Sequence, residues 1–125
     1  LARWVMMAAP RYGKQKDKNQ NELVSVLKSM GVEVIDLSQV GDEVPDTLLI
    51  CGGVLEFAEI KNPDNWYGKK GLNDNQKRFA INHGVDVYVL RTNDDCKHFV
   101  SGNRDELLYR PTADDVLRLS KRRRS

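Results

Sequence analysis

The chain has 125 residues, of which 40% are hydrophobic and 30% are charged, and its formal net charge is +2. This size and composition are typical of one compact domain. No stretch approaches the roughly 18 to 20 consecutive apolar residues of a membrane span. We therefore expect a soluble, cytoplasmic protein with no membrane partner.

The charge is unevenly distributed along the chain. Lys121 and the three arginines at 122–124 give the C-terminus four positive charges, whereas the rest has 16 basic and 18 acidic residues. Residues 120–125 are expected to form a basic tail that either contacts phosphate or only aids solubility. Residues 1–17 are expected to form an N-terminal arm, and whether those before Met6 are native is left open. Residues 18–119 are expected to form one domain.

Apolar periodicity and capping residues predict the first elements. A helix should follow Asp17, which makes a capping-box pattern with Gln20, and should end at Gly31. A strand is expected over residues 32–37. Two further apolar runs, 47–51 and 54–61, read as a pair of strands.

The second half of the domain begins with a loop over residues 62–71, which contain glycine, proline and polar side chains. Asn73 and Gln76 form another capping signature, so a helix is expected from there to Gly84. A strand over 85–90 completes the order α-β-β-β-α-β, and a strand-helix-strand crossover implies parallel pairing. Short helices are expected over residues 94–100 and 112–119.

Gly52 and Gly53 divide the two central apolar runs and predict a two-residue hairpin turn, which requires positive φ. If they form the turn, Cys51 pairs with Val54. Counting outward along the antiparallel ladder places Asp46 directly opposite Glu59, with the two side chains about 5 Å apart.

Two carboxylates so placed repel one another unless a positive charge lies between them. A divalent cation satisfies this condition, and carboxylate oxygens suit Mg²⁺ or Mn²⁺. Lys61 lies two residues beyond Glu59 and shares its face, whereas Glu56 takes the opposite face. The alternative is that Asp46 is a turn residue and that Glu59 and Lys61 belong to an exposed edge strand.

Other metal and redox chemistries find no support in the sequence. Cys51 and Cys96 form neither a disulfide framework nor a zinc motif. His83 and His98 lack zinc-ligand spacing, and His83 is explained by its place at a helix end. There is no Walker-type phosphate loop.

The pattern of Pro45 and Asp46, a gap of twelve residues, then Glu59, Ile60 and Lys61 resembles the signature of the PD-(D/E)XK nuclease superfamily. Its members share the α-β-β-β-α-β order. Within it, the chain most resembles phage and archaeal Holliday-junction resolvases and virus-type replication-repair nuclease domains, over about residues 18–90. The resemblance implies a restriction-endonuclease-like α/β fold with a central mixed sheet flanked by helices.

The resemblance also implies a site. Asp46 and Glu59 would bind catalytic Mg²⁺, for which Mn²⁺ could substitute, and the Ile60 carbonyl would be a further ligand. Lys61 would face the attacking water and the phosphate. A metal assists phosphodiester hydrolysis by neutralising phosphate charge and generating hydroxide near neutral pH.

Two more residues are implied in the site with open alternatives. Glu22 lies on the first helix, where the superfamily often supplies another carboxylate, but it also fits a solvated helix acid. Gln76 lies near the start of the second helix, where related nucleases place a polar side chain towards the scissile phosphate. It fits a capping-box residue equally well.

DNA would need a basic surface, and two segments that flank the site in sequence could provide it. The alternative is that both are solvated loops. The candidate DNA-binding residues are Arg11, Lys14, Lys16, Lys18, Trp66, Tyr67, Lys69 and Lys70.

The resemblance therefore implies a Mg²⁺-dependent DNA endonuclease that cuts branched DNA such as Holliday junctions in DNA repair. Two symmetric cuts need two active sites, so a homodimer is expected. A phage or prophage origin, and hence the cytoplasm of a bacterium or phage-infected host, suits the resemblance. The alternatives are a restriction-like or general DNA-processing nuclease and a non-cleaving nucleic-acid-binding subunit with the same fold.

Overall fold

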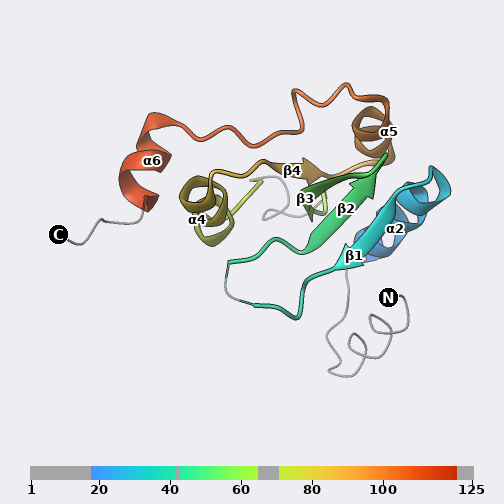
Figure 1. Cartoon of the computed structure of the whole chain (residues 1–125), viewed down its shortest axis with the longest axis horizontal. Coiled ribbons are helices and arrows are strands. Elements are labelled where there is room, and N and C mark those ends of the chain that lie inside the picture. The colour runs from blue at the N-terminus through green and yellow to red at the C-terminus, as the bar shows by residue number, and fades with distance from the viewer. Residues whose placement is uncertain (1–17, 42, 65–70, 121–125) are drawn as a thin grey trace.

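The computed structural model describes residues 18–41, 43–64 and 71–120 (Figure 1). The predicted α-β-β-β-α-β order is confirmed within these residues, and so are the two later helices. Each of the described helices is too short or too polar to traverse a lipid bilayer. In chain order the elements are α2 (Lys18–Ser29), β1 (Glu33–Asp36), β2 (Thr47–Cys51), β3 (Val54–Ile60), α4 (Asp74–His83), β4 (Val87–Leu90), α5 (Asn93–Ser101) and α6 (Ala113–Leu119).

The four strands form one mixed sheet in the order β1-β2-β3-β4. β1 and β3 are antiparallel to β2, whereas β4 is parallel to β3, as the crossover predicted. β3 and β4 consequently end at the same edge of the sheet, where β2 begins. We call this edge the carboxyl end of the sheet.

Alternating side chains divide the sheet into two buried faces. On one face, Leu49 and Ile60 pack with Leu23 and Leu27 of α2 and with Phe99 of α5. On the other face, strand residues contact the inner side of α4. The second core contains Phe57, Leu72, Phe79, Ala80, Val85, Val87, Val89 and Tyr109. The sheet is thus the middle layer of an α/β fold, with α2 and α5 on one side and α4 on the other (Figure 1).

Local hydrogen bonds fix the ends of α4. Asn73 and Gln76 make the predicted capping box, and Gly84 closes the helix in the left-handed conformation. Thr112 and Asp115 cap α6 in the same way. The predicted cap at Asp17 lies outside the described residues.

The strands are shorter than predicted at four ends, and at two of these a helix carbonyl accepts the N–H that would otherwise join the strand. Val32 donates its N–H to the Leu27 carbonyl at the end of α2 (3.0 Å), so β1 begins one residue later than expected. Val85 donates to Ala80 of α4 (3.2 Å), and β4 begins only at Val87. β1 ends at Asp36, one residue before the expected Leu37, and β3 ends at Ile60, one residue before the expected Lys61.

The hairpin register is confirmed. Cys51 pairs with Val54, and the ladder continues to Thr47 opposite Ala58. Gly52 and Gly53 have φ values of 60° and 83°, so both central residues of the turn are left-handed. That combination matches the right-handed twist of the two strands.

Gly53→Val should lower the free energy of unfolding by about 1 to 2 kcal/mol, because the left-handed conformation is strained for a residue with a Cβ. Beyond the two neighbouring residues in the chain, nothing lies within 4 Å of a Cβ built there, so the cost comes from the backbone conformation. Gly53→Asn should lose much less, since Asn tolerates this conformation. Urea unfolding followed by circular dichroism measures both values. Equal losses in the two variants would contradict the assigned turn.

Candidate active site at the carboxyl end of the sheet

Asp46 and Glu59 meet at the carboxyl end of the sheet. The β2–β3 ladder ends with Thr47 opposite Ala58. Asp46 directly precedes Thr47 and Glu59 directly follows Ala58, so both acids lie just beyond this last pair. The backbone N–H of Asp46 donates to Oε2 of Glu59 at 2.7 Å. The juxtaposition predicted from the glycine turn is therefore present in the structure.

Glu59 is completely buried, with 0% of its surface exposed. Its second oxygen, Oε1, accepts a hydrogen bond from Nε2 of Gln76 at 2.9 Å. The Lys61 ammonium lies 3.9 Å from the same oxygen. Both carboxyl oxygens thus have polar partners, as a buried carboxyl group requires.

Burial raises the pKa of Glu59 to about 8, and the negative charge of Asp46 adds to the increase. A hydrogen bond between the two carboxyl groups acts in the same direction. The Asp46 N–H and the Lys61 ammonium oppose it, because they stabilise the ionised form. Near neutral pH, Glu59 therefore keeps a proton, which a bound cation would displace.

Gln76 makes the predicted capping box and also contacts Glu59. Its Oε1 accepts from the N–H of Asn73, and its own N–H donates to Oδ1 of Asn73, each at 2.9 Å. Its amide nitrogen meanwhile donates to Glu59. The capping box therefore fixes the side chain that reaches the buried carboxyl group.

The orientation of the Ile60–Lys61 peptide determines the direction in which the Ile60 carbonyl points. The N–H of Lys61 donates to the Leu90 carbonyl of β4 at 3.0 Å. Because a trans peptide directs its C=O opposite to its N–H, the Ile60 carbonyl points away from β4 and towards the side of β2. A continued ladder would set Pro45 opposite, and proline has no N–H to offer this oxygen.

The donor set fits a hard divalent cation. Two carboxyl groups and one backbone carbonyl supply only oxygen, which Mg²⁺ and Mn²⁺ prefer, and Mg²⁺ sites usually retain several waters. Among the described residues, no third Asp, Glu, His or Cys joins Asp46 and Glu59 in a metal-binding group. A cation held here would therefore keep positions for water and substrate.

Glu22 is exposed on α2 and stays a predicted site residue. One turn earlier, the Asn19 amide donates to the Lys61 carbonyl at 2.9 Å and to the Arg91 carbonyl at 3.4 Å. These bonds bring the start of α2 to the carboxyl end of the sheet. Glu22 thus lies one helical turn from residues that adjoin the site.

Asn19 and Arg91 are the residues at this end that sequence reasoning missed. The Arg91 guanidinium lies beside Gly71, whose Cβ, if present, would lie 3.2 Å from Nη2. Arg91 could have been found from the sequence, because it directly follows β4. This strand is parallel to β3, so both strands end at the same edge of the sheet. Asn19 carried no comparable signal, because its contacts join residues 42 and 72 positions apart.

The predicted DNA-binding residues lie almost entirely outside the described residues. Lys18 is the first residue of α2, beside Asn19. Residues 61–64 lead into one of the undescribed segments, and Gly71 follows it. Both predicted basic segments therefore join the described structure at the carboxyl end of the sheet. Outside the described residues lie Arg11, Lys14, Lys16, Trp66, Tyr67, Lys69 and Lys70.

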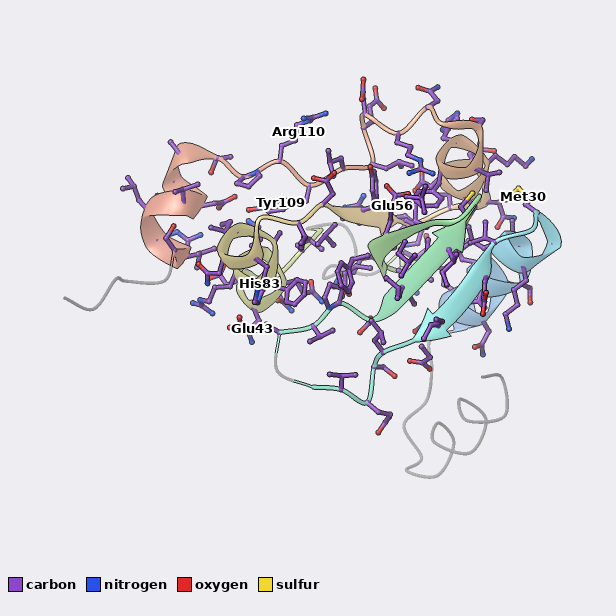
Figure 2. The ribbon with its side chains drawn as sticks, viewed as in Figure 1. Met30, Glu43, Glu56, His83, Tyr109 and Arg110 are labelled. Carbon is purple, nitrogen blue, oxygen red and sulfur yellow. The ribbon has the colours of Figure 1, made fainter. Side chains whose placement is uncertain are left out.

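Other polar groups are accounted for elsewhere in the fold. Glu56, which is labelled in Figure 2, pairs with Arg104. It lies on the opposite face from Glu59, as strand alternation predicted. Cys96 is fully buried, and burial raises the pKa of its thiol to about 11. A thiol of that kind is a poor nucleophile.

Comparison with models of known protein families, with curated proteins and with solved structures gives no significant match.

The raised pKa of Glu59 predicts that stability falls with increasing pH. Between pH 4.5 and about 8 the folded state keeps a proton that the unfolded chain has lost. In buffer with a chelator, the free energy of unfolding should therefore fall by up to about 1.4 kcal/mol per pH unit in this window. The contribution is fully present below the window and is lost above it.

Urea unfolding at a series of pH values measures this slope. Glu59→Gln keeps the shape and cannot ionise, so it should remove the slope. Glu33→Gln, an exposed change on β1 of the same sheet, serves as the control and should leave the slope intact. An unchanged slope in Glu59→Gln would contradict the assignment.

Proposed function

We propose that the chain is a divalent-metal-dependent phosphodiesterase of the PD-(D/E)XK kind that acts on DNA. The observation that carries the proposal is the buried Glu59 opposite Asp46, with the Lys61 ammonium 3.9 Å from the Glu59 carboxyl group. Burying an acid beside a second acid lowers the stability of the fold, because ionisation of the buried group becomes unfavourable. Such an arrangement is typical of functional sites.

Each residue has a role that follows from its position. Asp46 and Glu59 would hold the cation, together with the Ile60 carbonyl. A cation bound there supplies Lewis acidity for phosphodiester hydrolysis. Lys61 would stabilise negative charge on the phosphate and orient the attacking water. Gln76 would keep the Glu59 carboxyl group in one orientation through its hydrogen bond.

The substrate proposal is branched DNA, cut by a homodimer. Support for nucleic acid comes from the two predicted basic segments, both of which join the described structure beside the proposed site. The preference for a four-way junction rests on the resemblance to junction resolvases. Two cuts on opposing strands would then need the sites of two subunits.

The cleavage test compares four-way junction, flap, single-stranded and linear duplex DNA in Mg²⁺. We expect the junction to be cut fastest. Asp46→Asn, Glu59→Gln and Lys61→Met should each lower kcat by about 100-fold or more, because each removes a charge needed in the transition state. Mn²⁺ should replace Mg²⁺, and a chelator should abolish cleavage.

Glu33→Gln is the matched control, since it makes the same chemical change as Glu59→Gln at an exposed position of the sheet. It should cleave like the wild type. Full cleavage by Asp46→Asn or Glu59→Gln would overturn the site. If the wild type binds DNA but cuts none of the four substrates with either metal, the non-cleaving alternative replaces the nuclease.

The homodimer gives a separate prediction for the mass in solution. Light scattering coupled to gel filtration should give twice the 14.3 kDa mass of one chain. The dimer should persist in Glu59→Gln, because this residue is buried within one chain. A 14.3 kDa particle that still cuts both strands of a junction would contradict the assembly.

A further inference from the structure

A shallow groove lies between the end of the β1–β2 connection and α4. Its lining includes Glu43 and Val44 on one side and Asn75, Phe79 and His83 on the other. Figure 2 shows Glu43 and His83 next to one another at the edge of α4. None of the site residues proposed above is part of this lining.

The α4 side of the groove is one continuous stripe. Asn75, Phe79 and His83 are spaced four residues apart, so they lie above one another on the same helix face over about 12 Å. The rings of Phe79 and His83 contact each other, with centroids 4.7 Å apart and planes tilted by 50°. Phe57 supports Phe79 from the sheet through an edge-on contact at 5.2 Å.

Polar contacts tie the two sides together. Arg78 lies 3.7 Å from the Glu43 carboxylate and donates to Oδ1 of Asn75 at 2.7 Å. Among the described residues the lining itself contains no lysine or arginine, and the guanidinium of Arg78 beside it is held by Glu43 and Asn75. The lining therefore offers a ring surface, an amide and a carboxylate, which suit a neutral planar ring with hydrogen-bonding groups better than a phosphate.

The groove lies near the proposed active site, because two of its lining residues are close to site residues along the chain. Val44 is two residues before Asp46, and Asn75 directly precedes Gln76, which donates to Glu59. A nucleotide with its phosphate at Glu59 would therefore have the groove beside it. Bases can enter such a groove only when they are unpaired or displaced from the stack.

We propose that this groove binds an unpaired nucleobase next to the scissile phosphate, stacked on the Phe79 and His83 rings. The inference rests on the proposed function, and it adds a substrate determinant to the same site. Junctions, flaps and single strands supply unpaired or easily opened bases. A continuous duplex does so only at the cost of unstacking.

The test uses wild type, His83→Ala and, as a matched control, His98→Ala, an exposed histidine on α5 away from the groove. Each protein receives normal substrate and substrates with one abasic site at each of the three positions on either side of the mapped cut. At one of these positions the missing base should lower wild-type kcat/KM by about 5- to 100-fold. His83→Ala should have a lower kcat/KM than wild type on normal DNA, and the abasic site at that position should lower its kcat/KM little further. His98→Ala should behave as wild type on every substrate.

Equal cleavage of every abasic substrate by the wild type would overturn the groove while leaving the nuclease intact. The groove proposal would also be overturned if His83→Ala and the missing base lowered kcat/KM independently, so that the two factors multiplied. If the wild type cuts no DNA at all, the proposed function fails, and a DNA-binding measurement then tests whether the groove binds a base. DNA with 2-aminopurine beside a junction or nick should then lose fluorescence on binding to wild type but not to His83→Ala, and an equal response in both would reject base binding.

Discussion

A carboxyl group buried beside a second carboxyl group dominates the energetics at one end of this fold. Removing Glu59 from water is expensive, and the neighbouring Asp46 makes its ionisation more so. The fold meets the cost with three polar contacts, from the Asp46 backbone, the Gln76 amide and the Lys61 ammonium. Each contact comes from a different part of the chain or a different kind of group, so the strands and α4 must all be in place.

The crossover from β3 through α4 to β4 provides that arrangement. Because β3 and β4 are parallel, α4 must run back along the sheet, and its first turn lies where the strands end. The same turn contains the capping box, so one side chain closes the helix and reaches the buried acid. At the start of α2, Asn19 joins the ends of both parallel strands to the opposite layer of the fold.

Local rules were sufficient for much of this architecture. Glycine pairs and capping residues act over a few positions, so the register of β2 and β3 and the ends of α4 and α6 could be predicted. Strand ends were less predictable, because Val32 and Val85 bind helix carbonyls that only the folded chain brings near. The complete burial of Glu59 and the contacts of Asn19 likewise depend on packing between distant segments. The roles of the site residues remain predictions.

The glycine turn also limits how the chain can change in length during evolution. Twelve residues separate Asp46 from Glu59: five paired positions on each strand and the two glycines. Adding one residue to each strand lengthens the hairpin and leaves the two acids opposite, whereas a single insertion on one strand needs a bulge. In homologous chains the number of residues between the two acids is therefore expected to change by even numbers. The connection after Lys61 can change by any number of residues, because it does not set this register.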